Sequence, residues 1–253
     1  MTMSKALRSI CVLGFISGCA SWLPTAVPMR SIDYPSAAAP AHCLMVFLPG
    51  LGDTGARFEQ RGFVSDVRAQ HLSIDMVAAD ASLGYYANGI LTERLFTDVV
   101  APRASRGYAQ IWVVGISMGG LGTFLYSRQR PSGEVYGVLA LSPYLGEQQV
   151  SDAVRSEGGL STWQAPPPVA TMNASNYTSE LWRWLQAVNA GREPGPQLYI
   201  GYGLQDRLAR VDVLLGDDLP TAHVFTVDGE HNWDTWKVLF ARFLSTDALA
   251  GCK

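Results

Sequence analysis

Apolar runs of strand length alternate with longer helical patterns along most of the chain. The strand-length runs lie at 44–48, 74–78, 111–115, 135–141, 197–201 and 223–227. Several of them are almost continuously apolar, which is typical of strands buried on both faces of a parallel sheet. Helical patterns fall between them, at 58–71, 91–103, 119–129, 207–215 and 234–244. This alternation predicts an α/β fold with a doubly wound, mostly parallel sheet and helices on both faces.

The interval 146–196 interrupts this alternation. It contains three consecutive prolines at 166–168, a helical pattern at 180–190, and three tryptophans, Trp163, Trp182 and Trp184. An insertion at this point starts at the carboxyl edge of the sheet, where open α/β folds bind their substrates. The segment is therefore either a cap over the active site or a helix packed against the flank of the sheet, and the sequence leaves both open.

The first 18 residues have the pattern of a signal peptide. Lys5 and Arg8 supply positive charge, and residues 10–16 form an apolar stretch that is too short to span a bilayer. The stretch ends in Ile16-Ser17-Gly18-Cys19, which resembles the bacterial lipoprotein signal, where cleavage precedes a cysteine that is then acylated. The alternative is an ordinary secretory signal that is cleaved near Ala20.

The lipoprotein resemblance implies that Cys19 carries several acyl chains, which hold a domain stably on a membrane. Ala20 stands where an aspartate would retain a lipoprotein in the inner membrane, and this favours the outer membrane of a bacterial cell envelope. Residues 19–42 are rich in proline, alanine and serine without periodicity, which predicts a tether. The remaining residues, 43–253, are long enough for one domain with a single core.

Composition and charge narrow the class of protein. Hydrophobic residues make up 48% of the 253 residues and charged residues 16%, which is typical of a folded globular chain. The formal net charge is −3, and the chain has no dense basic stretch, so a nucleic acid partner is not expected. The histidines and carboxylates show no metal-ligand spacing, and we expect neither a metal nor an organic cofactor.

The motif Gly115-Ile116-Ser117-Met118-Gly119 matches the G-x-S-x-G pattern of a nucleophilic serine. An apolar β-rich run precedes it and a helical pattern follows it. Such a strand–turn–helix bend holds the serine in a strained conformation that exposes its hydroxyl, and side chains at the flanking glycines would clash. Ser117 is the candidate nucleophile, and the alternative is a serine that only packs in a tight turn.

A serine hydroxyl needs an adjacent base, and the chain has four histidines. Three of them, His42, His71 and His223, fall at the amino edge of the predicted sheet. His231 follows the last strand and so lies at the carboxyl edge, where Ser117 also lies. It also comes last in the chain order serine, acid, histidine that this fold requires.

The acid should follow the strand that precedes the histidine's strand. Asp206 comes just after the run at 197–201 and meets this requirement, whereas Asp212 falls within the next helix and Asp228 is still on the last strand. We therefore assign Asp206 the role of orienting His231. The alternative is that Asp206 only caps the helix that follows.

An oxyanion hole needs backbone N–H groups that point at the developing negative charge. One donor is expected from Met118, the residue after the nucleophile. The other is expected from the glycine-rich loop at 50–55, where Leu51 follows Gly50.

Four cysteines sort by their position. Cys11 leaves with the signal peptide and Cys19 is the lipidation candidate. Cys43 starts the first predicted strand at the amino edge of the sheet, and the last helix runs back toward that edge. A disulfide between Cys43 and Cys252 is therefore expected in an oxidising compartment. The alternative is a buried Cys43 with a free Cys252 at a frayed terminus.

Several short motifs carry a family resemblance. They are the loop Leu48-Pro49-Gly50-Leu51-Gly52-Asp53, the stretches around Tyr85-Tyr86, Glu93-Arg94-Leu95 and Val99-Val100-Ala101-Pro102, and the motif His231-Asn232-Trp233 with Trp236. From about Cys43 to Leu244 the chain resembles the bacterial serine esterases grouped with esterase D and the mycolyltransferases. The loop at 50–55 is also similar to that of acyl-protein thioesterases. The proline-rich insertion departs from the compact members of the group.

This resemblance implies an α/β-hydrolase fold and a serine esterase that cleaves carboxylic esters through an acyl-enzyme at Ser117. The expected substrate is a small-molecule or lipid-like ester. Two alternatives remain at this point: an acyltransferase that uses the same three residues, and a non-catalytic surface module on a hydrolase fold.

Overall fold

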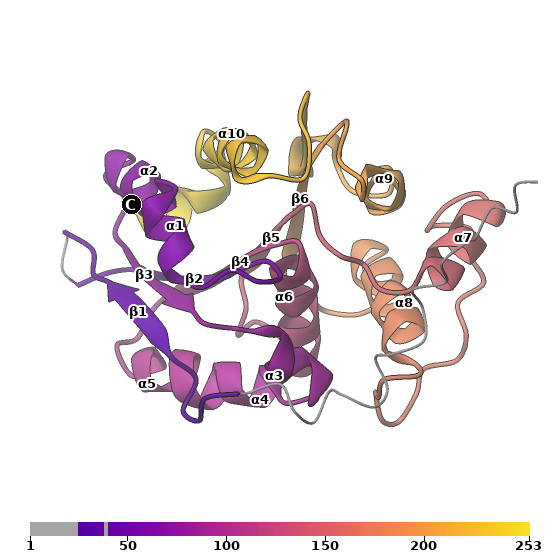
Figure 1. Ribbon diagram of the computed structural model, residues 1–253, viewed down its shortest axis with the longest axis horizontal. Coiled ribbons are helices and arrows are strands. Elements are labelled where there is room, and N and C mark those ends of the chain that lie inside the picture. Colours follow the sequence, from indigo (N-terminus) through magenta and orange to yellow (C-terminus); the bar gives the residue numbers. More distant parts are fainter. Residues whose placement is uncertain (1–24, 38–39) are drawn as a thin grey trace, which may run out of the picture.

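A computed structural model describes residues 25–37 and 40–253 of the protein (Figure 1). Seven strands form one sheet in the order β1-β3-β2-β4-β5-β6-β7. The strands are β1 (Ser31–Tyr34), β2 (Cys43–Leu48), β3 (Ile74–Ala79), β4 (Gln110–Ile116), β5 (Gly137–Leu141), β6 (Gln197–Gly203) and β7 (Val224–Val227). All neighbouring pairs are parallel except β1 with β3. The predicted doubly wound, mostly parallel sheet is confirmed.

The predicted signal peptide 1–18 and the lipidation candidate Cys19 lie outside the described residues and stay predictions. Within the described part of the chain, no helix combines the length and the apolarity needed to cross a bilayer.

Strand β1 begins the sheet earlier than the sequence predicts. Residues 31–34 fall in the predicted tether, but they pair antiparallel with β3, from Ser31 opposite Ala79 to Tyr34 opposite Met76. Only Tyr34 of these four residues is buried. A four-residue edge strand with one buried side chain has no apolar run that marks it in the sequence. The structured domain therefore starts before Cys43.

The helices follow the predicted pattern with local breaks. They are α1 (Ala56–Gln60), α2 (Phe63–Ala69), α3 (Leu83–Ala87), α4 (Leu91–Arg94), α5 (Ala101–Ala104), α6 (Met118–Gln129), α7 (Gln148–Ser156), α8 (Tyr177–Asn189), α9 (Ala209–Gly216) and α10 (Trp233–Leu244). The pattern at 58–71 is two helices, because Gly62 has a φ of 85° and ends the first. A π-helical segment, Leu95–Val100, joins α4 to α5. Helices α3 and α7 are absent from the sequence prediction.

Helices cover both faces of the sheet (Figure 1), and a hydrophobic core lies between the sheet and each layer of helices. On one face, aromatic side chains from α1, α2 and α10 pack on the strands, among them Phe58, Phe63 and Phe240. On the other face, α6 and α8 pack with the segment from α3 to α5. Strands β2, β4 and β5 are therefore buried on both sides, which accounts for their uninterrupted apolar sequences.

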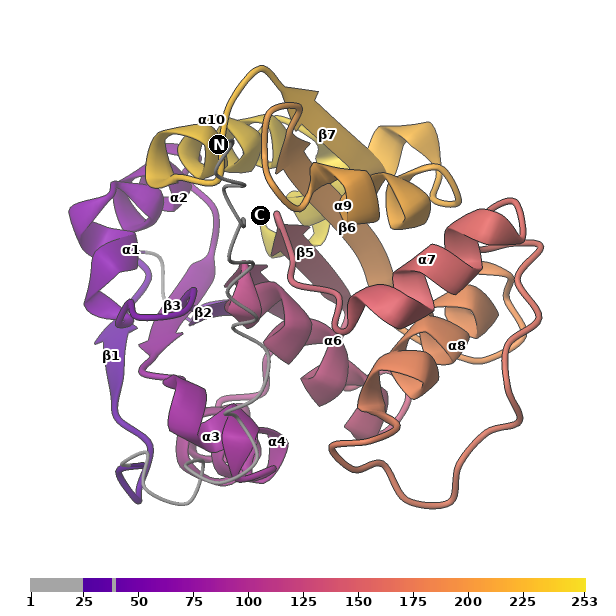
Figure 2. The same cartoon turned by 45° about the vertical axis from the view of Figure 1, so that its right-hand side comes forward.

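The interval 146–196 places its main helix on the flank of the sheet and not over the carboxyl edge. Helix α8 lies beside α6 (Figure 2). Trp182 is fully buried there, and its Nε1 donates to the carbonyl oxygen of Leu145 at 3.0 Å. Trp163 and Trp184 are also buried in this core. Of the two interpretations that the sequence leaves open, α8 agrees with a helix packed against the flank of the sheet, because its tryptophans stabilise the core there.

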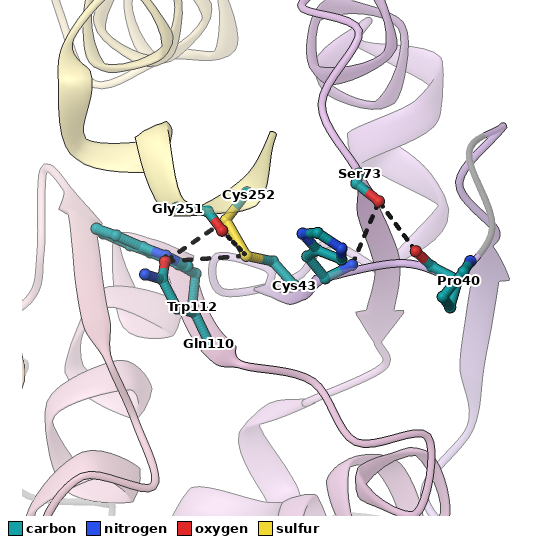
Figure 3. Close-up of a disulfide and its surroundings, with 8 residues drawn as sticks. Pro40, Cys43, Ser73, Gln110, Trp112, Gly251 and Cys252 are labelled. Atoms are coloured by element: carbon teal, nitrogen blue, oxygen red, sulfur yellow. Dashed lines mark hydrogen bonds between the residues drawn. A yellow bond between two sulfur atoms is a disulfide. The ribbon is translucent and has the colours of Figure 1, made fainter.

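The amino edge of the sheet carries a disulfide (Figure 3). Cys43 at the start of β2 and Cys252 in the 3-10 helix Asp247–Cys252 are bonded, with Cα atoms 5.5 Å apart. Both residues are fully buried. The N–H of Ser73, just before β3, donates to the carbonyl oxygen of Cys252 at 2.6 Å. The disulfide expected from the sequence is therefore present, and it links the C-terminal end of the chain to the start of β2.

Candidate active site

Ser117 lies on the bend between β4 and α6 and has φ 54° and ψ −114°, a strained conformation for a residue with a side chain. The glycines on either side permit it. A Cβ on Gly115 would lie 2.1 Å from the carbonyl oxygen of Gly119, and a Cβ on Gly119 would lie 2.1 Å from that of Leu48. Both distances are below any real contact, so the G-x-S-x-G spacing is required by backbone packing at this bend.

His231 lies on the loop after β7 and faces Ser117. Its Nε2 is 2.9 Å from Ser117 Oγ. The imidazole packs edge-to-face on the indole of Trp236, with ring centroids 5.0 Å apart. His223 lies at the opposite edge, where it stacks on Tyr199. The structure brings Ser117 and His231 together from positions 114 residues apart.

Asp206 follows β6 and completes this line of side chains. Its Oδ2 and Oδ1 lie 2.8 and 2.9 Å from His231 Nδ1, and its side chain is fully buried. The N–H of Leu208 donates to Oδ1 at 2.8 Å. Burial raises the pKa of this carboxyl, but the hydrogen bonds from His231, Leu208 and Ser142 outweigh burial and hold the pKa below its ordinary value.

The ionised Asp206 fixes the tautomer of the imidazole. A carboxylate only accepts hydrogen bonds, so His231 Nδ1 must carry the proton. In the neutral imidazole, Nε2 is then an acceptor, and the Ser117 hydroxyl donates to it. In this tautomer, Nε2 of His231 can accept a proton from Ser117.

The predicted oxyanion donors are the backbone N–H groups of Met118 and Leu51. Met118 is the first residue of α6, and Gly50 packs closely enough that a Cβ there would be 3.4 Å from Ser117 Cβ. Within residues 25–37 and 40–253, neither the N–H of Met118 nor that of Leu51 donates to a hydrogen bond. The side chain of Leu51 is 61% exposed, so it contributes little to the packing of this loop.

A tryptophan connects the two loops that contribute to the site. Trp233, two residues after His231, donates from Nε1 to Asp53 Oδ2 at 3.1 Å. Asp53 belongs to the same loop as Leu51, and it also pairs with Arg57. The histidine loop and the predicted oxyanion loop are therefore held to each other by a direct hydrogen bond.

Two buried polar residues near Asp206 have no signal in the sequence. Ser142 directly follows β5 and lies close enough to the Asp206 carboxylate to lower the pKa of that carboxyl. Asp212, on α9, is fully buried, and neither of its carboxylate oxygens has a partner among the described residues. A serine at a strand end and an aspartate in a helix are each too common to be marked from local sequence alone.

A cavity of about 290 Å³ lies away from Ser117, between the end of α6 and the segment before β6. Three arginines line it, and each is paired with a glutamate: Arg128 and Arg183 with Glu180, and Arg130 with Glu134. Its charges are therefore compensated within the protein. In the described part of the chain, no group of three or more histidine, cysteine or acidic side chains is arranged to hold a metal ion.

Comparisons with known proteins give a match only at the level of structure. No family model matches the sequence, and no curated protein matches it. Solved structures do match. An S-formylglutathione hydrolase from Staphylococcus aureus aligns with a TM-score of 0.55 and 16% identity, over 86% of this chain and 94% of that one.

Two further structures show the same similarity. The fluorophosphonate-binding serine hydrolase F of Staphylococcus aureus aligns with a TM-score of 0.57 and 16% identity, over 86% of this chain and 96% of that one. A ferulic acid esterase aligns with a TM-score of 0.55 and 15% identity, over 86% and 97%. At such identities the similarity establishes the architecture, which agrees with the sheet order and the serine bend described above. The chain has the α/β-hydrolase fold.

Proposed function

We propose that the protein is a serine hydrolase that cleaves carboxylic esters through an acyl-enzyme at Ser117. The observation that carries this proposal is the unbroken line of hydrogen bonds from Ser117 Oγ through the imidazole of His231 to the buried Asp206. A non-catalytic module has no need of a strained serine with this alignment. The fold of the solved neighbours, which include a serine hydrolase and a ferulic acid esterase, supports the same reaction class.

In the proposed mechanism, His231 Nε2 accepts the proton of Ser117 as Oγ attacks the ester carbonyl carbon. The imidazolium that forms is stabilised by the Asp206 carboxylate. The N–H groups of Leu51 and Met118 donate to the carbonyl oxygen as it becomes negative. His231 then protonates the leaving alcohol, and the acyl group remains on Ser117.

In the second half of the reaction, His231 removes a proton from a water molecule, which attacks the acyl carbon. The tetrahedral oxygen is again stabilised by Leu51 and Met118. Collapse of this intermediate returns the proton to Ser117 and releases the carboxylic acid. The proposed substrate is a small-molecule or lipid-like carboxylic ester. The finer resemblance to esterase D and the mycolyltransferases remains a prediction from the sequence.

The experiment that tests this proposal compares the wild type with Ser117→Ala. We expect a fluorophosphonate probe to label only the wild type. We also expect the variant to lose turnover on p-nitrophenyl esters by on the order of 10⁴-fold or more, because the nucleophile is gone. A series of rising acyl chain length maps substrate choice, and an added alcohol acceptor separates hydrolysis from acyl transfer.

The control is a thermal melt, in which Ser117→Ala should match the wild type because alanine keeps the small side chain at this bend. Retained hydrolysis in a folded Ser117→Ala variant contradicts the assignment of the nucleophile. Acyl transfer to the alcohol in place of hydrolysis changes the reaction class and keeps Ser117.

We also propose that acylated Cys19 anchors the mature protein on a membrane of a bacterial cell envelope. Only the sequence supports this, through the segment Ile16-Ser17-Gly18-Cys19. In a bacterial host, Cys19→Ala should release the protein from membranes or leave its precursor uncleaved. Fractionation and mass spectrometry measure this, and an unmodified mature N-terminus in the wild type contradicts it.

A further inference from the structure

Ser142, the first residue after β5, has an unfavourable backbone conformation for its side chain. It is fully buried and has a φ of 43°, in the left-handed region that glycine adopts without strain. Its N–H donates to the carbonyl oxygen of Gly201 on β6 at 2.7 Å, which holds the backbone in place. A serine at a position that suits glycine calls for a role of its side chain.

The Ser142 hydroxyl lies between two polar groups. Trp236 Nε1 donates to Ser142 Oγ at 3.0 Å. On its other side, Ser142 lies close enough to the Asp206 carboxylate, beyond the end of the neighbouring strand β6, to lower the pKa of that carboxyl. An indole N–H only donates and a carboxylate only accepts, so the direction of each interaction is fixed. The oxygen of Ser142 accepts from Trp236, which leaves its single proton free to be donated to Asp206.

Trp236 contacts the histidine as well. Its indole packs edge-to-face on the imidazole of His231, at an interplanar angle of 89°. Trp236 is 5% exposed and lies in the first turn of α10. One side chain thus touches His231 directly and reaches Asp206 through Ser142.

We propose that Ser142 and Trp236 are positioning residues that fix the carboxylate plane of Asp206 toward His231. Without them, Asp206 has the N–H of Leu208 and the imidazole itself as partners, and rotation of the carboxylate about its last bond would misalign it. With Ser142 in place, donors approach the carboxylate from two elements besides the histidine loop. This inference rests on the proposed function, because a positioned acid matters only where His231 acts as a base.

Ser142→Gly is the sharpest test, because it removes the hydroxyl and relieves the backbone. We expect kcat on a soluble p-nitrophenyl ester to fall roughly 10- to 100-fold, the effect of losing one hydrogen bond to a charged group. We expect KM to stay unchanged and the melting temperature to stay equal or to rise. The rate of phosphonylation of Ser117 by a fluorophosphonate should fall in parallel with kcat.

Trp236→Phe gives a second, independent measurement. Phenylalanine keeps an aromatic ring at this position but lacks the N–H that orients Ser142. We expect a smaller loss of kcat, and the double variant Ser142→Gly/Trp236→Phe should be no slower than Ser142→Gly alone, since both act through one hydrogen bond. Trp182→Phe is the matched control, because its indole N–H bonds a carbonyl in the flank core and its loss should leave kcat unchanged.

The proposal is overturned if folded Ser142→Gly keeps kcat and the phosphonylation rate within twofold of the wild type. It is also overturned if the losses in the double variant simply add. These outcomes are distinct from failure of the proposed function, which would appear as activity that survives in Ser117→Ala. If Ser142→Gly does not fold, Ser142→Ala and the Trp236→Phe measurement decide the question.

Discussion

The two edges of the sheet differ in how far their polar groups are buried and in how these groups are paired. At the carboxyl edge, Asp206 and Asp212 are both completely buried, and Ser117 and Ser142 have positive φ angles. At the amino edge, Asp75 pairs with Arg106 and Tyr108 at the surface. The amino edge also carries the disulfide that joins β2 to the end of the chain.

This difference indicates that the carboxyl edge of the sheet is organised for a reaction and the amino edge for stability. Strained backbone and buried carboxylates lower the free energy of unfolding, and they persist where a reaction requires them. The amino edge also has one strained residue, His71 with a φ of 55°, but the carboxylate described there is paired at the surface, and the edge adds a covalent link. Substitutions at the carboxyl edge should therefore change turnover most, and those at the amino edge should change stability.

The largest contrast is expected from Asp206→Asn. The amide keeps the size of the side chain but can no longer hold Nδ1 of His231 as the donor, so Nε2 no longer accepts from Ser117. We expect kcat to fall by on the order of 10⁴-fold. Asp75→Asn at the amino edge is the matched control and should keep its turnover.

Steady-state kinetics on one soluble ester measure both variants, with circular dichroism to show that they fold. A fully active Asp206→Asn variant would place the acid elsewhere. A comparable loss of turnover in Asp75→Asn would remove the distinction between the two edges.

A smaller effect is expected from the disulfide. Its cysteines are 209 residues apart, and closing so long a loop stabilises the fold by about 5 kcal/mol in the chain-entropy model, with measured losses of roughly 2–5 kcal/mol. Cys43→Ala with Cys252→Ala should lower the unfolding free energy in this range. Turnover per folded molecule should not change, because the link lies at the edge opposite Ser117.

Urea unfolding with and without a reductant measures this effect. It separates the loss of the disulfide bond from the replacement of the two cysteine side chains. The wild type should lose stability on reduction, and the double variant should not respond. Two titratable thiols at Cys43 and Cys252 in oxidatively purified, unfolded wild type would show that the bond does not form.

Most of the sheet could be predicted from the sequence because its strands are buried on both faces. Strand β4 is apolar along almost its whole length, which is typical of a strand that is buried on both faces of a parallel sheet. Strand β1 escapes prediction because it is four residues long and mostly exposed. The break between α1 and α2 depends on the positive φ of Gly62, which the helical pattern around it conceals.

The candidate site likewise contains residues that could be predicted from the sequence and residues that could not. Ser117, His231 and Asp206 could be identified because chain order and the edge of the sheet restrict each choice. Ser142 could not, because its partner Trp236 is 94 residues away and no local pattern connects them. Likewise, nothing in the sequence of α9 shows that Asp212 points into the protein. Contacts of this kind arise only when the helices pack.

Asp212 is a carboxyl-edge group whose effect on stability depends on pH, and the sign of this effect can be worked out. Burial, and then the nearby charge of Asp206, raise the pKa of Asp212 well above its ordinary value. The folded protein therefore binds this proton more tightly than the unfolded chain does. The stability that follows from this is complete below the unfolded pKa and is lost progressively as the pH rises above it toward the folded pKa.

Asp212→Asn removes this titration, so the variant should lose less stability than the wild type as the pH rises from about 4 toward neutrality. Asp75→Asn should show the opposite sign. Burial opposes ionisation of Asp75, but hydrogen bonds from Ser36, Tyr108 and Arg106 outweigh it and lower its pKa, so its carboxylate stabilises the fold above the unfolded pKa and this is lost as the pH falls. Urea unfolding of both variants and the wild type from well below pH 4 to neutrality gives the slopes, because the effect of Asp75 falls below its unfolded pKa of about 4. If the Asp212→Asn and wild-type curves run parallel, the Asp212 carboxyl is not held protonated by its burial.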